Sequence, residues 1–349
     1  MALAKRKHVR RNRHGPCRYE RVTQLPCSFA ELAYPPCLIP SGGSFVQAMS
    51  IPIVHSPDYD ADFPVSHRFP MGKYSRLASI LRTEGLLRRE TAHSPDKAPA
   101  SWLQLAHQRR YVDQVIALSV PKPIEREIGF TVSEKVALRA RKATAGTALA
   151  ARLALEHGLA LNSAGGSHHA RFAQGAGFCT FNDVAVAAKL LLADRTIARA
   201  LVIDLDVHQG DGTAEICRDD TRIFTVSVHA ARNYPVRKQT SDLDIALPDG
   251  MRDDAYIEII EDMLTNTLKS FHPDIVFYNA GVDPHEEDRL GRLSLSDEGL
   301  KRRDETVLGF FHRHGIALCG VIGGGYASDI DALAERHAIL FRTAAAIAG

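Results

Sequence analysis

The stretch LVIDLDVHQGDG, residues 201–212, decides how this chain folds. Three apolar residues, typical of a buried β-strand, run directly into Asp204, Asp206 and His208. Asp211 follows three residues later. Burying so many ionisable groups costs free energy unless an opposite charge or a metal ion offsets the cost. The stretch therefore predicts a strand of a buried sheet that ends at a functional site.

The same pattern of short apolar segments and amphipathic segments continues on both sides of this stretch after residue 50. We predict strands at 51–55, 159–162, 198–208, 222–229, 274–281 and 316–325, and helices at 74–87, 133–158 (one long or two short), 182–194, 254–271, 297–315 and 331–347. Asn182 is a suitable N-cap for one of these helices. Apolar strands that alternate with helices predict an α/β fold, with a mostly parallel central sheet covered by helices on both faces.

The composition excludes several classes of protein. The 349 residues are 45% hydrophobic and 24% charged, which is typical of a globular protein. No apolar run approaches the roughly 18–20 residues of a membrane span, and no apolar secretory signal is recognisable. The six cysteines include no C-x-x-C pair, so neither a disulfide scaffold nor a zinc ribbon is indicated. We therefore expect a cytoplasmic protein without a membrane partner.

The charge is distributed unevenly along the chain. Residues 1–48 carry a net charge of +6, and the remainder carries −4. We predict that residues 1–48 form a basic, disordered extension and that residues 49–349 form a single domain. An alternative is that Met49 is the true start of the protein. The basic segment could contact nucleic acid, but it has no interleaved aromatic residues or binding motif, so nucleic acid is not an expected partner.

Ionisable and hydroxyl groups follow four of the predicted strands. His168 and His169 come after one strand, Asp283 and Tyr326 each come after another, and the acids of residues 201–212 come after a fourth. In an open parallel sheet, ligands bind beyond the carboxyl ends of the strands. We therefore expect these side chains to meet at one edge of the sheet.

Three of these residues could hold a divalent cation. If the strand extends to residue 208, its period of two places Asp204, Asp206 and His208 on one face. Asp206 and His208, with Asp283 from a neighbouring strand, would supply one nitrogen and two carboxylates and leave room for water and substrate, as in a catalytic zinc site. The set is rich in oxygen, so Fe²⁺ is an alternative to Zn²⁺. Such a cation would offset the buried negative charge.

Each feature alone has a plainer interpretation. An Asp-x-His pair at a strand end is usually a solvated loop, the tandem histidines could be a structural pair, and Tyr326 could be a packed aromatic residue. Residues 323–325 could be a phosphate loop, but no Lys-Ser/Thr follows them. The meeting of all these groups at one edge of the sheet favours a functional site.

The chain resembles the zinc-dependent histone deacetylase family, which has the arginase/deacetylase fold. The matching segments, in the order of the family, are GGSHHARFAQGAGFCTFND (165–183), VIDLDVHQGDG (202–212), NAGVD (279–283) and GGGYASD (323–329). The resemblance covers about residues 50–349. The segments HSPDYD (55–60) and DRLGRLSLSDEGLKRRDETV (288–307), together with Gln209, are most similar to the class IV branch.

The resemblance assigns a role to each residue that matches a family motif. The zinc ligands are Asp206, His208 and Asp283; the catalytic residues are His168, His169, Tyr326, Asp204 and Asp211; the walls of the substrate tunnel are Gly177, Phe178 and Tyr234; and a potassium ion (K⁺) is held by Asp204 and Ser227. In these roles His169 is the general base, oriented by Asp211. His168 adds positive charge and is held by Asp204, while Tyr326 donates a hydrogen bond to the oxyanion.

The activity implied is metal-dependent hydrolysis that removes acetyl or long-chain fatty acyl groups from lysine side chains of proteins or peptides. The family's rim acid, which grips the substrate backbone, has no clear match, because Glu125 and Glu127 are only nearby. The alternatives are a deacetylase of small acylated amines such as acetylpolyamines, a non-catalytic acyl-lysine binding protein, and an arginase-type enzyme with two metal ions.

Overall fold

The computed structural model describes residues 51–64 and 66–349, so the predictions for residues 1–48 and for Met49 lie outside the described residues. Within them, the strands are β1 (Ile53–Val54), β2 (Ala92–His93), β3 (Leu159–Asn162), β4 (Ala200–Asp204), β5 (Ile223–Ala230), β6 (Leu243–Leu247), β7 (Ile275–Asn279) and β8 (Ala317–Val321). They form one sheet in the order β2-β1-β3-β8-β7-β4-β5-β6, and every neighbouring pair is parallel.

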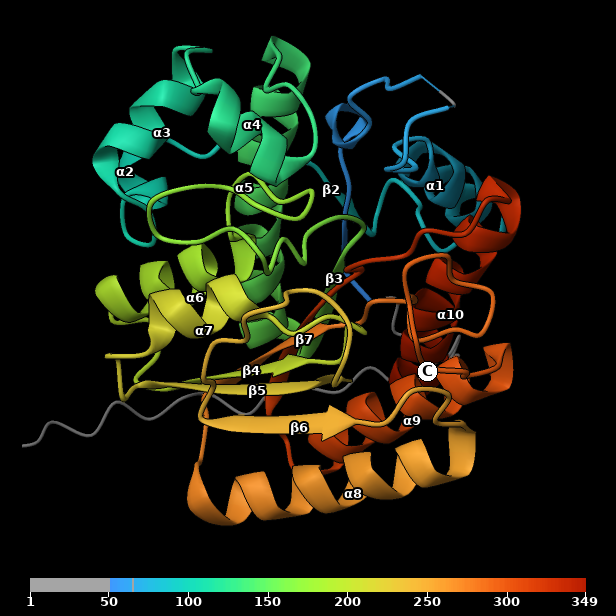
Figure 1. The fold of residues 1–349 in the computed structure, drawn as a ribbon. Coiled ribbons are helices and arrows are strands. Elements are labelled where there is room, and N and C mark those ends of the chain that lie inside the picture. Colours follow the sequence, from blue (N-terminus) through green and yellow to red (C-terminus); the bar gives the residue numbers. More distant parts are fainter. Residues whose placement is uncertain (1–50, 65) are drawn as a thin grey trace, which may run out of the picture. The chain divides into compact units, whose positions relative to one another are not determined.

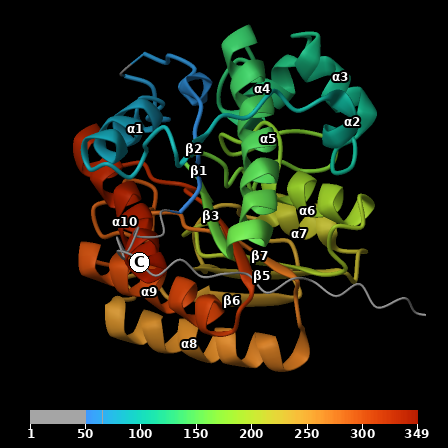
Figure 2. The same ribbon diagram turned by 180° about the vertical axis from the view of Figure 1, so that it is seen from behind.

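Helices cover both faces of this sheet (Figures 1 and 2). Their bounds are η1 (Pro57–Tyr59), α1 (Lys73–Thr83), α2 (Ala100–Leu103), α3 (Arg109–Ile116), α4 (Lys122–Ile128), α5 (Glu134–His157), α6 (Asp183–Ala193), α7 (Asp211–Cys217), α8 (Asp253–Ser270), α9 (Asp297–Arg313) and α10 (Ile330–Ala348). Helices α5 and α6 pack on one face, and α8, α9 and α10 pack on the other (Figure 1). The predicted α/β fold with a parallel sheet is therefore confirmed.

The strand order explains where a site can form. After β3 the chain passes over two strand positions to β4, continues outward through β5 and β6, and then returns to fill the gap with β7 and β8. As a result β3, β8, β7 and β4 are consecutive neighbours in the sheet. The direction of strand addition reverses between them, and such reversals leave a crevice at the carboxyl ends of the strands.

Local signals set the ends of the principal helices. Helix α5 is a single helix whose N-cap Ser133 accepts a hydrogen bond from the amide of Val136. It ends at Gly158, whose φ of 83° favours glycine. Asn182 caps α6 as predicted, because its side chain accepts a hydrogen bond from the amide of Ala185.

The structure differs from the sequence predictions at several elements. The strand predicted over 198–208 ends at Asp204, so Asp206 and His208 lie beyond it. The edge strand β6 was not predicted, since its LDIAL sequence is only half-buried and mixes charge with apolar residues. The short elements β2, α2, α3, α4 and α7 were also missed, because each is too short to show a periodic pattern.

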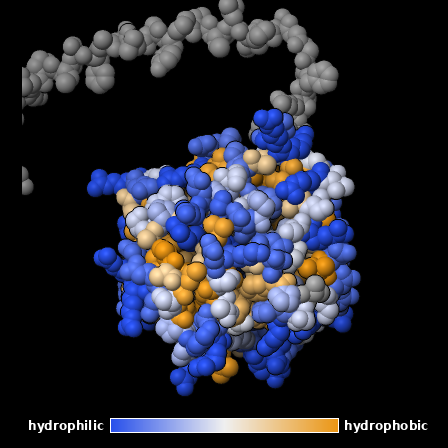
Figure 3. Space-filling view, turned by 90° about the horizontal axis from the view of Figure 1, so that it is seen from above, coloured by the Kyte–Doolittle hydropathy of each residue, from blue (hydrophilic) through white to orange (hydrophobic). Residues whose placement is uncertain are grey.

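The polarity of the surface and of the helices is as expected from the moderate hydrophobic content of the sequence. In the face shown in Figure 3, hydrophilic residues predominate and hydrophobic ones form small groups among them. Among the described residues, no helix is both long and apolar enough to cross a membrane.

Candidate active site and metal centre

Asp206, His208 and Asp283 converge at the carboxyl edge of the sheet. Their potential ligand atoms lie within 4.8 Å of one another, and all three residues are buried. Nδ1 of His208 is 3.0 Å from Oδ1 of Asp206 and 3.2 Å from Oδ2 of Asp283. The outer carboxylate oxygens accept hydrogen bonds from the backbone amides of Gly324 and Val207, so both carboxylates are held toward the centre of the group.

The charges of this group fit a divalent cation. Burial and the neighbouring Asp206 carboxylate raise the pKa of Asp283 to about 7. Burial also raises the pKa of Asp206, but His168 and His208 more than offset it and hold this pKa well below its usual range. Two buried carboxylates thus repel each other next to an imidazole, and a bound cation would offset that repulsion. One nitrogen and two carboxylate groups are suitable ligands for Zn²⁺ or Fe²⁺.

Two successive hydrogen bonds between aspartate side chains and the backbone explain why strand β4 ends before the proposed metal ligands. The Asp204 carboxylate accepts a hydrogen bond from the amide of Asp206, and the Asp206 carboxylate accepts one from the amide of His208. Aspartate side chains that bond the backbone two residues further on bend the chain. The alternation expected for a longer strand is therefore wrong here, and the bend directs both side chains to the metal group instead.

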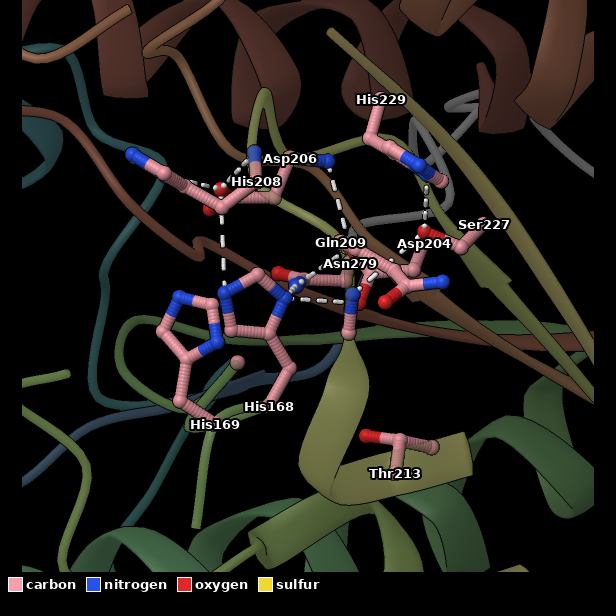
Figure 4. Close-up of polar contacts among 12 residues, drawn as sticks. His168, His169, Asp204, Asp206, His208, Gln209, Thr213, Ser227, His229 and Asn279 are labelled. Carbon is pink, nitrogen blue, oxygen red and sulfur yellow. Dashed lines mark hydrogen bonds and ion pairs between the residues drawn. The ribbon is translucent and has the colours of Figure 1, made fainter. Parts of the chain in front are cut away.

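The tandem histidines lie beside Asp206 and His208 (Figure 4). A different acid holds each of them. Nδ1 of His168 is 2.7 Å from the Asp204 carboxylate, and Nδ1 of His169 is 2.6 Å from that of Asp211. Arg171 donates two hydrogen bonds to the other oxygen of Asp211. Each imidazole is therefore fixed in orientation through Nδ1, which leaves Nε2 for other partners.

The two histidines have opposite charge preferences. Burial lowers the pKa of His168, but the Asp204 and Asp206 carboxylates more than offset this and raise it to about 9. Burial and the charge on His168 lower the pKa of His169 to about 4. At neutral pH His168 is therefore charged and His169 is neutral, as a general base must be.

Tyr326 completes the site from the segment after β8. Its ring lies 6.1 Å from that of His208 and 5.7 Å from that of Phe178. Its amide donates a hydrogen bond to the Asp288 carboxylate. Burial and the carboxylates of Asp206 and Asp283 hold the pKa of Tyr326 well above its usual value, so its hydroxyl stays protonated.

An open cavity of about 430 Å³ leads to these groups and is lined by His169, His208 and Tyr326. Gly177, Phe178 and Tyr234, the predicted tunnel walls, line it as well. Gly177 has a φ of 53°, and a Cβ atom there would lie 2.5 Å from the His169 ring, so only glycine fits. The Tyr234 ring stands perpendicular to the His169 ring at 4.7 Å.

A second, very small cavity of about 20 Å³ lies deeper, between His168, Asp206 and Tyr326. Phe69, Tyr74 and Arg139 are among its other lining residues. A water molecule needs about 10–15 Å³ on this measure, so this cavity accommodates a group about the size of one water or methyl.

We use the term floor for the buried residues of this site, which are His168, His169, Asp204, Asp206, His208, Asp211, Asp283 and Tyr326. Every predicted catalytic residue and every predicted zinc ligand belongs to it. Ser227, the predicted potassium ligand, is the in-register neighbour of Asp204 across β4 and β5. Its hydroxyl contacts the ring of His229 at 3.0 Å, and the potassium assignment stays a prediction (Figure 4).

Sequence reasoning missed several residues of the site. Arg171, which binds Asp211, could have been noticed because it lies two residues after the tandem histidines. Arg68, Arg232 and Arg292 also line the open cavity, but they come from separate loops with no shared motif. Among the two acids that were considered for the rim, Glu127 lines the cavity, whereas Glu125 is buried and bonds Lys122 and the amide of Val132.

Comparisons with known proteins agree with this geometry. The histone deacetylase domain family matches residues 67–343. The chain is 44% identical over 296 residues to an uncharacterized protein of Picosynechococcus sp., covering 85% of this chain and 99% of that one. It is 31% identical over 293 residues to histone deacetylase 2 of Arabidopsis thaliana, covering 80% of this chain and 76% of that protein.

Among solved structures, an HDAC homologue complexed with SAHA superimposes with a TM-score of 0.72 at 24% identity, covering 85% of this chain and 84% of that one. This likeness shows the shared fold. The family match and the relative from Arabidopsis thaliana show membership of the family as well as the fold, because they cover most of the chain. The chain belongs to the histone deacetylase family.

Proposed function

We propose that this protein is a metal-dependent amide hydrolase that removes short acyl groups, acetyl above all, from lysine side chains of proteins or peptides. One observation carries the proposal: His169, which the Asp211 carboxylate holds through Nδ1, and Tyr326 line the same cavity as His208 of the Asp-His-Asp group. A zinc or ferrous ion held by Asp206, His208 and Asp283 would polarise the acyl carbonyl and lower the pKa of a water molecule.

The residues of the chain then handle the protons and the charge. His169 accepts the proton of the attacking water through Nε2 and later delivers one to the departing amine, while Asp211 fixes its tautomer. His168 remains charged beside Asp204 and stabilises negative charge nearby. Tyr326 donates its hydroxyl hydrogen bond to the developing oxyanion.

The small inner cavity supports a short acyl group. Its volume of about 20 Å³ accommodates a methyl group next to Tyr326 and Asp206. A long-chain fatty acyl group is the alternative, and it is far larger than this cavity. Class IV membership, part of this proposal, rests on the motif resemblance that includes Gln209, whose buried amide bonds Asp244 and the backbone of Gln239. A potassium ion near Asp204 and Ser227 is also proposed.

The test is a direct comparison of matched acetyl-lysine and myristoyl-lysine peptides, followed by mass spectrometry with the zinc-loaded and the ferrous protein. We expect faster loss of the acetyl group and no turnover after chelation of the metal. Faster loss of the myristoyl group would contradict the short-acyl proposal. Turnover of acetylpolyamines alone would favour the small-amine alternative, and tight binding without turnover would favour the non-catalytic one.

A further inference from the structure

The outer part of the open cavity is rich in arginine. Arg68, Arg232 and Arg292 line it together with the floor residues His169 and His208. All three arginines are exposed. They belong to three loops, which precede α1, follow β5 and precede α9. We call these three arginines and Glu127 the mouth.

Two of the arginines are held side by side by one carboxylate. Arg232 and Arg292 bind the same Oδ2 atom of Asp249, at 2.7 and 3.1 Å. Their side chains are nevertheless 73% and 53% exposed. An arginine carries five N–H donors, so most donors of both guanidinium groups remain free for a ligand. Asp249 therefore offsets one of the two positive charges and fixes the position of both.

The opposite charge is scarce at the mouth. Among the described residues that line the cavity outside the floor, Glu127 is the only carboxylate. Its carbonyl accepts a hydrogen bond from the amide of Gly177, which ties the end of α4 to the tunnel wall. With Asp249 included, three arginines face two carboxylates, so the mouth keeps a net positive charge.

We infer that the mouth selects acyl-lysines that are flanked by acidic residues, an inference that rests on the proposed function. When the acyl group of a substrate lysine reaches His169 and Tyr326, the residues on either side of that lysine in the substrate lie beside the three arginines. Free guanidinium donors bind carboxylates well, and a positive entrance attracts anionic segments and repels cationic ones. Lysine-rich segments and polyamines are the substrates that this entrance disfavours.

The experiment uses three acetyl-lysine peptides that are identical except for Asp, Gln or Lys on both sides of the modified residue, and one acetylated polyamine. We expect kcat/KM for the Asp peptide to exceed that for the Lys peptide roughly tenfold, mainly through KM, since two or three exposed ion pairs form. The ratio falls to about twofold in 0.5 M salt, where exposed charges are screened.

Three variants sharpen the test. The triple variant R68Q/R232Q/R292Q is expected to bring the Asp-to-Lys ratio close to unity, whereas Glu127→Gln increases it. Arg302→Gln removes a half-buried arginine that pairs with Asp254 between α8 and α9 and does not line the cavity, so the ratio stays at the wild-type value. Thermal unfolding of each variant shows that the fold is retained.

The outcomes separate this inference from the proposed function. Equal kcat/KM values for the Asp and Lys peptides, or fastest turnover of the polyamine, would overturn the charge selectivity while leaving the hydrolase intact. An absence of hydrolysis for every substrate would overturn the proposed function and this inference together.

Discussion

The floor and the mouth of the cavity are built in opposite ways. Floor residues are at most 8% exposed, and the carboxylates and histidines among them bind one another or the backbone. The mouth consists of three exposed arginines on separate loops and of Glu127 near the end of α4. Buried polar groups must be satisfied, whereas exposed ion pairs add little to stability. The residues proposed for catalysis thus lie in the buried floor, where the fold constrains them most. The residues proposed to select the substrate lie in the exposed mouth, where the fold tolerates substitution.

The largest effect is expected at the metal group of the floor. Asp283→Asn keeps a side-chain oxygen for the amide of Val207 but removes a charged metal ligand. We expect bound metal to fall well below about one ion per chain and activity to fall by roughly 10³ or more. Metal analysis and peptide hydrolysis measure both, and full metal content in this variant would contradict the ligand assignment.

The next effect separates chemistry from metal binding. Tyr326→Phe retains the packing of the ring but removes the donor to the oxyanion, so turnover is expected to fall on the order of 10²–10³. The metal content stays at the wild-type level. Near-normal turnover would refute the role of Tyr326.

The floor and the mouth also differ in how far they could be predicted from the sequence. The floor was predictable because its residues directly follow strands, and strand ends of a parallel sheet meet at one edge. The bend after Asp204 was not, since it depends on side-chain hydrogen bonds that alternation does not reveal. The mouth was not predictable either, because Arg232 and Arg292 meet only through Asp249 in the folded chain.

A buried ion pair, Arg303 with Asp304, binds the backbone next to the floor residue Asp283. Arg303 is fully buried, contacts Asp304 at 2.9 Å and donates to the carbonyl of Gly281, just before Asp283. Replacing it removes the charged partner of the buried Asp304 carboxylate, which then keeps only the hydrogen bond from the Tyr278 hydroxyl. Losing the charged partner of a buried ion pair costs about 3–5 kcal/mol. We expect Arg303→Gln to lower the unfolding free energy by this order in denaturant titrations. A loss below about 1 kcal/mol would contradict this supporting role.

The loop that carries the tandem histidines depends on a neutral imidazole. Nδ1 of His107 donates to the carbonyl of Arg171, and Nε2 accepts from the amide of Asn182. Burial lowers the pKa of His107 to about 4, against about 6.5 in an unfolded chain. The unfolded state therefore binds the proton first, so this stability is complete above pH 6.5 and is lost as the pH falls toward 4.

This titration predicts an acid-sensitive fold. From His107 alone, the unfolding free energy should decrease by about 2 kcal/mol between pH 7 and pH 5. His107→Gln cannot titrate, so its decrease over this interval should be smaller than that of the wild type by about that amount. Denaturant titrations of both proteins at the two pH values give the difference, and identical pH dependence would exclude the contribution of His107.

The smallest effect on stability is expected at the mouth. Arg232→Gln breaks one of the two bonds to Asp249, but the pair is exposed and Arg292 still binds the carboxylate. The thermal midpoint should therefore change by less than about 3 °C. Arg303→Gln is the matched comparison, because it removes the same side chain from a buried ion pair. If the two variants lost similar stability, the mouth would be a structural part of the fold, and its arginines could not vary independently of the floor.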